Sequence, residues 1–165
     1  MIKTRILFIC NGNIFRSLTA EYALKFALGK ISEHEVRSAG LVPAPHEIVT
    51  FVHEYMEGRG IDISGHAPAQ FTGSSLGTAD LAVAMGTEHR DKIADLYGVR
   101  LPLFSEVAYG TVEPLLDVFE VVPDWRQNET EAAAYGCSLM DYIFDGMEGF
   151  IANMGTFTGT AGKQV

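Results

Sequence analysis

Short apolar runs alternate with segments of mixed polarity along this chain. Two apolar runs predict buried strands at residues 4–10 and 79–85, and the sequence EVRSAG predicts a short strand at residues 35–40 that ends on a turn glycine. A third apolar run predicts one more strand at residues 99–104. We expect this strand at an edge of the sheet, because Pro102 has no backbone N–H to donate to a neighbouring strand.

The segments between these runs place apolar residues three and four positions apart, as amphipathic helices do. They predict helices at residues 17–30, around residues 48–56, at residues 87–97 and from about residue 129 to residue 153. Strands that alternate with helices form parallel sheets through right-handed crossovers. We therefore expect an α/β fold, a three-layer open sheet of about four parallel strands with helices on both faces and a phosphate-binding loop after the first strand.

The length and composition indicate one globular unit. Residues 1–155 are predicted to form a single domain, because the chain is long enough for one sizeable core and too short for two. Residues 156–165 have little apolar pattern to pack, and we expect a flexible tail there. Hydrophobic residues make up 47% and charged residues 20%, which is ordinary for a folded domain.

Charge and hydropathy exclude several classes of function. The apolar stretches are far shorter than the roughly 20 residues of a membrane span, and we find no secretory signal, so we expect a cytoplasmic protein without a membrane contact. The net charge of −9 argues against nucleic-acid binding, which requires a basic surface. Cys10 and Cys137 cannot form a disulfide framework, which indicates a reducing compartment. Any anion site in this chain has to be local.

Residues 10–17, CNGNIFRS, join the first predicted strand to the first predicted helix. The backbone amides of such a loop converge before the helix N-terminus and can bind an oxyanion there. Gly12 and Asn13 suit the positive φ angles of a tight loop, and Arg16 adds a bidentate clamp. These positive surroundings favour the thiolate of Cys10, which makes it a candidate nucleophile. The expected phosphate-binding residues are Asn11, Gly12, Asn13, Ile14, Phe15, Arg16 and Ser17.

Each of these residues alone has a simpler interpretation. A single cysteine at a strand end is more often a small buried hydrophobe than a nucleophile. The combination of thiol, glycine, asparagine, arginine and serine at one strand-to-helix junction disfavours that interpretation for Cys10. Arg16 stands at the helix end that is unfavourable for a cation, which itself indicates a bound anion. The absence of a GxxxxGK[ST] motif excludes a nucleotide-type phosphate loop.

The loop resembles the signature CxGNxxRS of the low-molecular-weight protein tyrosine phosphatase family, which includes related arsenate reductases. The similarity continues in order with SAG at residues 38–40, GIDISGHAPAQ at 60–70, DLAVAM at 80–85 and VVPDWR at 121–126. It therefore covers nearly the whole chain.

The resemblance implies a phosphomonoester hydrolase that acts through a cysteinyl-phosphate intermediate and needs no metal or organic cofactor. It implies that Cys10 is the nucleophile, that Arg16 binds the phosphate and its transition state, and that Ser17 stabilises the thiolate. Asp124 would protonate the leaving group and then activate water. Asn13 would be held in an unusual backbone conformation by a hydrogen-bond network that reaches His66.

Several positions depart from the family pattern or have another interpretation. Phe15 stands where some relatives carry a second, protective cysteine, so we expect Cys137 to be a packing residue. Residues 41–47 contain no aromatic where many relatives line the pocket. The usual Asp-Pro-aromatic sequence is replaced by Asp124 and Trp125, which places the aromatic substrate rim in a shifted position. Taken without the family, an aspartate before a helix is more often a cap, and His66 is more often a structural histidine.

Three functions remain open on the sequence alone. The first is hydrolysis of phosphotyrosine in proteins or of small aryl phosphates. The second is reduction of arsenate, which would need an external thiol because Cys137 is the only other cysteine. The third is a noncatalytic phosphate-binding regulator, which the joint retention of Cys10, Arg16, Ser17 and Asp124 disfavours. The sequence determines neither the physiological substrate nor the oligomeric state.

Overall fold

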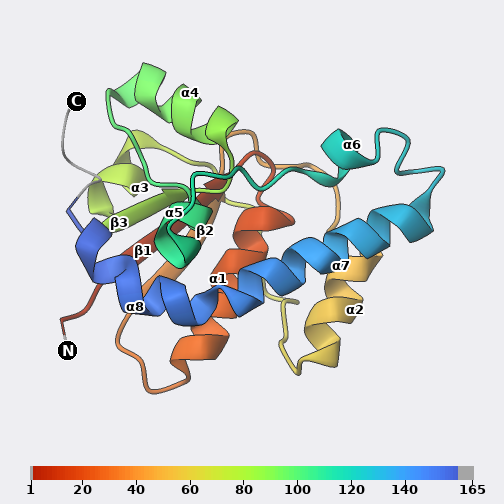
Figure 1. The fold of residues 1–165 in the computed structure, drawn as a ribbon, viewed down its shortest axis with the longest axis horizontal. Coiled ribbons are helices and arrows are strands. Elements are labelled where there is room, and N and C mark those ends of the chain that lie inside the picture. The colour runs from red at the N-terminus through yellow and green to blue at the C-terminus, as the bar shows by residue number, and fades with distance from the viewer. Residues whose placement is uncertain (1, 160–165) are drawn as a thin grey trace.

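Three parallel strands form the centre of the structure, a computed structural model that describes residues 2–159 (Figure 1). The middle strand is β1 (Arg5–Cys10). It pairs with β2 (Glu35–Gly40) on one side and with β3 (Leu81–Ala84) on the other. The α/β fold class predicted from the alternation of strands and helices is confirmed.

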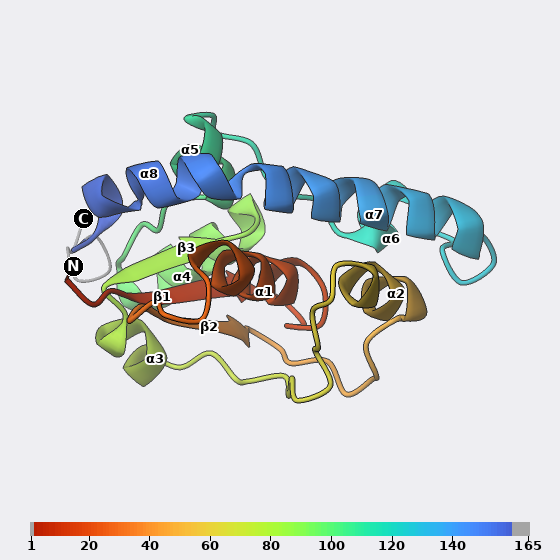
Figure 2. The ribbon, with the colours of Figure 1, turned by 90° about the horizontal axis from the view of Figure 1, so that it is seen from below.

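Helices cover both faces of this sheet (Figure 2). The helices of the described residues are α1 (Arg16–Leu28), α2 (Thr50–Gly58), α3 (Gly73–Thr78), α4 (Thr87–Tyr97), α5 (Phe104–Tyr109), α6 (Val118–Val121), α7 (Glu129–Asp145) and α8 (Met147–Phe157). Apolar side chains of α1, α2, α5, α7 and α8 share one core cluster, and those of α3 and α4 share a second. None of these helices combines the length and the apolar character that crossing a membrane requires.

Side chains of β1 alternate between the two core clusters. Ile6 and Phe8 belong to the larger cluster, and Leu7 and Ile9 belong to the smaller one. A strand buried on both faces has to be apolar throughout, which explains the continuous run that predicted it. Cys10 ends this run at the same sheet edge at which β2 and β3 end. In open parallel sheets ligands bind at this edge.

The strand predicted at residues 99–104 is reduced to one parallel bridge between Ala84 and Leu103. The N–H of Ala84 donates to the carbonyl oxygen of Pro102 at 3.0 Å. Pro102 has no N–H, and the N–H of Leu103 donates to Glu106 Oε2 at 2.6 Å in the first turn of α5. Neither residue can therefore extend the ladder, and the sheet of the described residues has three strands instead of about four.

The helix predicted at residues 129–153 is two helices that meet at Gly146. A Cβ atom at Gly146 would lie 2.9 Å from the ring of Tyr109, so the chain needs glycine at this contact with α5. The second helix reaches Phe157, beyond the start of the flexible tail predicted for residues 156–165. The end of that predicted tail lies outside the described residues.

Candidate active site

The loop that joins β1 to α1 folds around the sulfur of Cys10. Its Sγ lies 2.9 Å from Ser17 Oγ in the first turn of α1, and the backbone N–H of Asn13 donates to it over 3.3 Å. Asn13 has a φ of 57°, the one positive value outside glycine in the described part of the chain. Asparagine tolerates this left-handed conformation better than most residues. The turn at Asn13 thus directs an amide at the sulfur.

Asn13 is fully buried, and its side chain is hydrogen-bonded through both its nitrogen and its oxygen. Its Nδ2 donates to Ser17 Oγ at 2.9 Å and to Ser38 Oγ at 2.8 Å. Its Oδ1 accepts from the N–H of Ala69 at 3.0 Å, and its carbonyl oxygen lies 2.8 Å from His66 Nε2. These contacts offset the strain of the left-handed backbone, which is about 1–3 kcal/mol. The structure thus contains a hydrogen-bond network that joins Asn13 to His66.

Arg16 begins α1, and its side chain is only 2% exposed. Its Nη1 donates to the carbonyl oxygen of Leu115 at 2.8 Å and to Glu88 Oε1 at 3.1 Å. Its Nη2 donates to Asp117 Oδ2 at 2.8 Å. Its Nε is buried and has no hydrogen-bond partner among the described residues. The edge formed by Nε and Nη2 therefore keeps N–H groups free, and this edge can bind an oxyanion through two parallel hydrogen bonds.

Carboxylates surround this buried cation. Asp117 and Glu88 contact the guanidinium directly, and Glu120 Oε2 lies 4.0 Å from Nη1. Burial alone would lower the pKa of the Arg16 guanidinium, but Asp117, the sulfur of Cys10 and Glu88 outweigh burial and raise the pKa above its ordinary value. The guanidinium is therefore permanently charged, and its orientation is set by the side chains around it.

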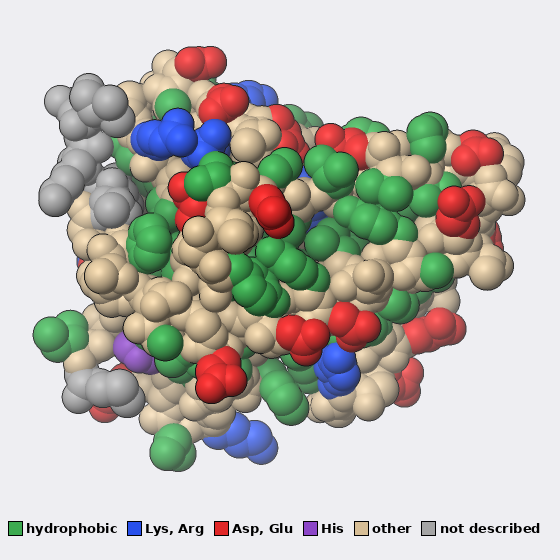
Figure 3. Space-filling model, viewed as in Figure 1, with side chains coloured by type: hydrophobic (Ala, Val, Ile, Leu, Met, Phe, Trp, Pro, Cys, Tyr) green, Lys and Arg blue, Asp and Glu red, His purple; other side chains and the backbone are tan. Residues whose placement is uncertain are grey.

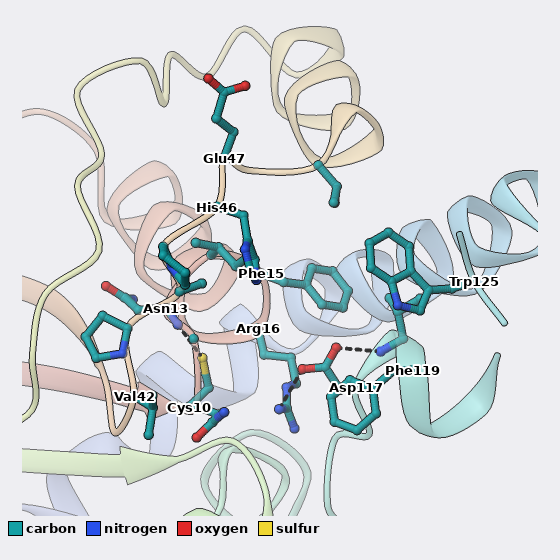
Figure 4. A pocket seen from close by; sticks show the side chains of 18 of the residues that line it. Cys10, Asn13, Phe15, Arg16, Val42, His46, Glu47, Asp117, Phe119 and Trp125 are labelled. Carbon is teal, nitrogen blue, oxygen red and sulfur yellow. Dashed lines mark hydrogen bonds and ion pairs between the residues drawn. The ribbon is translucent and has the colours of Figure 1, made fainter. Parts of the chain in front are cut away.

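A cavity of about 550 Å³ opens over the loop (Figure 4). It is lined by residues 10–16 of the loop, by residues 42–47 after β2, and by residues 117–119 and 125–126 before α7. The sulfur of Cys10 and the guanidinium of Arg16 lie side by side in this view, with Asp117 next to the guanidinium.

Aromatic side chains form much of the cavity wall. The rings of Phe15 and Phe51 meet edge to face with their centroids 5.6 Å apart. Phe119 is 56% exposed at the rim, and the guanidinium of Arg126 lies 4.8 Å from the ring centroid of Trp125. Phe51 and Phe119 thus provide the aromatic wall that residues 41–47 lack. An apolar cavity with a few polar groups at one end is typical of small-molecule sites.

The family model for low molecular weight phosphotyrosine protein phosphatases matches residues 5–110. The chain belongs to this family. The resemblance seen in the signature is confirmed.

Curated relatives and solved structures extend this result. The chain is 43% identical over 98 residues to a protein from Ralstonia solanacearum named probable low molecular weight protein-tyrosine-phosphatase EpsP. That match covers 56% of this chain and 62% of the relative, which is less than two thirds of its length. The fold is similar to that of the YwlE arginine phosphatase from Geobacillus stearothermophilus, with a TM-score of 0.75 and 22% identity over 93% of this chain and 94% of that one. It is also similar to the low molecular weight protein tyrosine phosphatase from T. tengcongensis, with a TM-score of 0.71 and 25% identity over 91% and 99% of the two chains.

Most of the site residues expected from the family signature come together at the cavity. Residues 10–16 line it, and Ser17 contacts the sulfur from α1. Trp125 stands at the predicted rim (Figure 4). The structure thus brings Cys10, Arg16 and Ser17 together, and the roles assigned to them stay predictions.

Asp124, the predicted acid, is placed differently. It is exposed, its Oδ2 accepts from Asn128 Nδ2 at 2.5 Å, and it is not among the described residues that line the cavity. The N–H of Trp125 donates to the carbonyl oxygen of Val122 at 3.0 Å, and the turn that this bond closes carries Trp125 to the cavity and Asp124 toward solvent. Asp117 lines the cavity instead.

Asp117 was not among the predicted site residues, although the sequence around it carries a signal. The usual family sequence has an aromatic two positions after the aspartate, as Phe119 follows Asp117, whereas Trp125 follows its aspartate directly. Asp117 caps α6, where its Oδ1 accepts from the N–H of Val118 at 2.7 Å and its own N–H donates to Glu120 Oε2 at 2.6 Å. Its carboxylate is therefore held between a helix N-terminus and the arginine.

Cys137 is a half-buried free thiol on α7 and does not line the cavity. Burial raises the pKa of its thiol, with Asp141 and Glu54 acting in the same direction. These observations agree with the predicted packing role. Within the described residues, no group of histidine, cysteine, aspartate and glutamate side chains is placed to hold a metal ion.

Proposed function

We propose that this protein hydrolyses phosphotyrosine in proteins or small aryl phosphates through a cysteinyl-phosphate intermediate. The observation that carries this proposal is the free edge of the buried Arg16 guanidinium beside the sulfur of Cys10. A buried N–H without a partner is costly, and an oxyanion at this end of the cavity would satisfy it. Membership of the family and the printed name of the Ralstonia relative support the same function.

The phosphate would be bound by charge and by helix geometry together. The N-cap of α1 is Phe15, which offers no side-chain acceptor to the first helical turn. The N–H groups of that turn and of Asn11, Gly12, Ile14 and Phe15 would therefore be the donors for a bound oxyanion, and the helix dipole adds to them. The N–H of Asn13 donates to the sulfur instead. The Nε–Nη2 edge of Arg16 would bind two further oxygens. An acidic protein can hold an anion in this way because its positive potential is concentrated at one loop.

Hydrolysis would take two displacements at phosphorus. In the first, the thiolate of Cys10 attacks, the P–S bond forms, the P–O bond breaks, and the acid donates a proton to the departing phenoxide. In the second, the same carboxylate takes a proton from water, the water oxygen attacks phosphorus, and the P–S bond breaks. Inorganic phosphate leaves and the thiolate is restored. Ser17 Oγ, 2.9 Å from the sulfur, would stabilise the thiolate in both steps.

We assign the acid to Asp117 in place of Asp124. Asp117 lines the cavity, its side chain is 25% exposed, and its Oδ2 lies 2.8 Å from Arg16 Nη2. In an in-line displacement the leaving oxygen and the water that replaces it both lie opposite the sulfur, and we assign Asp117 to that side because its carboxylate lines the same cavity as Cys10. Asp124 is held by Asn128 outside the cavity.

The cavity walls support an aromatic substrate. Phe51, Phe119 and Trp125 could contact the ring of a phosphorylated tyrosine above the phosphate site. Figure 3 shows hydrophobic side chains gathered on the face that carries α6, and Leu116, Phe119 and Val121 are exposed in that segment by 41%, 56% and 42%. These exposed side chains could contact the residues that flank a phosphotyrosine. A cytoplasmic location is part of the proposal, because both cysteines are free thiols.

Hydrolysis assays with four substrates would test this proposal. We expect turnover of p-nitrophenyl phosphate and of a phosphotyrosine peptide. Phosphoarginine should be tested beside them because one similar fold is named an arginine phosphatase, and arsenate with an external thiol tests the reductase alternative. Cys10→Ser should abolish turnover while inorganic phosphate still binds. Phosphate binding without turnover of any substrate by the wild-type protein would reject the enzyme and favour a noncatalytic regulator.

A further inference from the structure

A residue outside the cavity lining contacts the guanidinium of Arg16. Glu88, in the first turn of α4, places its Oε1 3.1 Å from Arg16 Nη1. The other hydrogen bond of Nη1 goes to the backbone of Leu115, whose own N–H donates to the carbonyl oxygen of Met85 at the end of β3. Leu115 thus supplies a backbone contact and Glu88 a side-chain contact to the same nitrogen, Nη1.

Glu88 can reach this nitrogen because position 86 is glycine. A Cβ atom at Gly86 would lie 2.4 Å from Glu88 Oε2 and 2.7 Å from Glu88 Oε1. No real Cβ approaches an oxygen so closely, so any side chain at position 86 would displace the carboxylate. The φ of Gly86 is −136°, a value that every residue adopts. Space for the carboxylate is therefore the reason for glycine here, and backbone strain is not.

His89 confines the carboxylate on its other side. Its side chain is 1% exposed, its Nδ1 accepts from the N–H of Gly86 at 3.0 Å, and its Nε2 lies 3.1 Å from Glu88 Oε1. Because Nδ1 accepts a hydrogen bond, the neutral ring carries its proton on Nε2, beside the carboxylate. Oε1 of Glu88 thus accepts a hydrogen bond from the guanidinium, whereas the nearby Nε2 of His89 makes no hydrogen bond to it.

We infer that Glu88 is a positioning residue for Arg16 and that Gly86 is required for its action. The inference rests on the proposed function and extends it to residues behind the site. Two contacts to Nη1 and one to Nη2 fix the rotation of the guanidinium plane, so the Nε–Nη2 edge faces the oxyanion before it binds. Without the contact from Glu88, the plane can rotate, and the matched pair of hydrogen bonds to the oxyanion is lost for part of the time.

The position of the carboxylate oxygen matters more than its charge. The negative charge of Glu88 opposes a bound phosphate, because like charges repel. A neutral acceptor in the same place would keep the orientation of Arg16 and remove this repulsion. Glutamine has the same length as glutamate and can present such an oxygen to Nη1. Comparing glutamine with alanine at position 88 therefore separates the effect of orienting Arg16 from the effect of the negative charge.

Variants at positions 86 and 88 test the inference. Glu88→Ala removes the oxygen, Glu88→Gln keeps an uncharged oxygen, and Gly86→Ala displaces the carboxylate without deleting it. Glu33→Ala and Gly77→Ala are matched controls, because Glu33 is exposed and a Cβ at Gly77 would meet nothing within 4 Å. Each variant is measured for inorganic phosphate affinity by calorimetry, for kcat and KM with p-nitrophenyl phosphate, and for its thermal midpoint.

We expect Glu88→Ala to weaken phosphate binding and to lower kcat/KM by about tenfold each, because a hydrogen bond to a charged group is lost. Gly86→Ala should reproduce this loss, and Glu88→Gln should stay within about threefold of the wild type. The double variant should be no worse than either single alanine variant, since the added methyl group has no carboxylate left to displace. The controls should match the wild type.

The inference is overturned if folded Glu88→Ala binds phosphate as the wild type does, if glutamine does not restore binding, or if the losses at positions 86 and 88 add up. If Glu88→Ala does not fold, Gly86→Ala against Glu88→Gln makes the same comparison. Phosphate affinity does not depend on turnover. A wild-type protein that binds phosphate and hydrolyses no ester would therefore reject the proposed function while the affinities still decide the role of Glu88.

Discussion

The two sides of the cavity are built in different ways. Residues 10–17 are continuous in sequence, mostly buried, and held by hydrogen bonds from Asn13 to the loop, to β2 and to residues 66–69, although Asn11 is exposed. Residues 117–126 form the opposite side, where only the four-residue helix α6 is regular and Asp124 and Phe119 are exposed. The side that we propose binds phosphate, the binding side, thus depends on local backbone geometry. The side that we propose supplies the acid, the acid side, depends on a loop that tertiary contacts place.

This difference explains why one side has a recognisable sequence signature and the side to which we assign the acid has none. The binding loop needs particular residues at fixed spacing, since a left-handed turn, a sulfur and a guanidinium have to converge on one oxyanion. The acid side needs a single carboxylate above the sulfur, and any aspartate near the right part of the chain satisfies that need. Substitutions on the two sides should therefore have different effects. They range from a near-complete loss of activity on the binding side to a change in substrate affinity alone at the rim of the acid side.

The largest effect is expected from Arg16→Lys on the binding side. Lysine keeps the charge but loses the planar edge and the ability to contact Glu88, Leu115 and Asp117 at once. We expect kcat/KM for p-nitrophenyl phosphate to fall by a factor on the order of 10³. Steady-state kinetics measure this fall, and a loss below tenfold would show that charge alone suffices at this position.

The next largest effect is expected on kcat, where variants of Asp117 and Asp124 should differ. Asp117→Asn should lower kcat by about 10²–10³-fold for an ester with a poor leaving group, and far less for one with a good leaving group, because a general acid contributes on this scale. Asp124→Asn should change kcat less than twofold. A series of aryl phosphates of increasing phenol basicity measures the difference. Equal slopes for Asp117→Asn and the wild type would return the choice of acid to Asp124.

Asn13→Ala would test how far the binding side relies on its own hydrogen bonds. Alanine makes none of the side-chain contacts to Ser17, Ser38 and Ala69 and disfavours the positive φ. We expect a loss of about 2–4 kcal/mol in the free energy of unfolding. Urea unfolding measures it, and phosphate affinity should fall in the same variant. A stable variant with normal affinity would mean that the loop keeps its shape without this network.

Stability below neutral pH should depend on His89, behind the binding side. Burial and the charge of Arg16 lower the pKa of His89 from 6.5 to about 4, although Glu88 acts in the opposite direction. The unfolded chain therefore takes up a proton near pH 6.5, and the folded protein does so only near pH 4. The free energy of unfolding should fall as the pH is lowered through this window and should not change with this group above it.

Urea unfolding of the wild type and of His89→Asn at several pH values between 7 and 4 measures this dependence. Asparagine can accept from the N–H of Gly86 without taking up a proton, so its stability should fall less steeply. Carboxylates that do not interact with His89 contribute equally to both proteins, and Glu88, whose pKa His89 helps to lower, is part of the effect that the comparison measures. Parallel curves for the two proteins would show that the imidazole does not contribute.

The smallest effect is expected at the rim of the acid side. Phe119 is exposed and lines the cavity opening, so Phe119→Ala removes apolar contact with the substrate ring and leaves the phosphate site intact. We expect KM for aryl phosphates to rise about three- to tenfold, while the affinity for inorganic phosphate stays the same. Competition of phosphate against p-nitrophenyl phosphate measures both values. A parallel loss of phosphate affinity would place Phe119 in the binding site for the anion.

Several features of the fold depended on contacts that no local pattern reports. The strand at residues 5–10 follows from a continuous apolar run. The helix at residues 87–97 follows from apolar periodicity and from Gly98, which ends that helix with a φ of 67°. Helices of four to six residues, such as α3, α5 and α6, are too short for periodicity to appear. The strand predicted at residues 99–104 is shorter than expected because the N–H of Leu103 donates to Glu106 in α5, a contact that apolar patterning does not report.

The amino-acid sequence by itself determined the family, the parallel sheet and the phosphate loop, because these depend on residue types at short, fixed spacing. Only the tertiary structure decided which carboxylates meet Arg16. Glu88 and Asp117 lie 72 and 101 positions away along the chain, and their approach depends on how β3 and the segment before α6 pack against the loop. The spacing of residues along the chain determines local backbone geometry, whereas contacts between distant segments are determined by the packing of the whole domain.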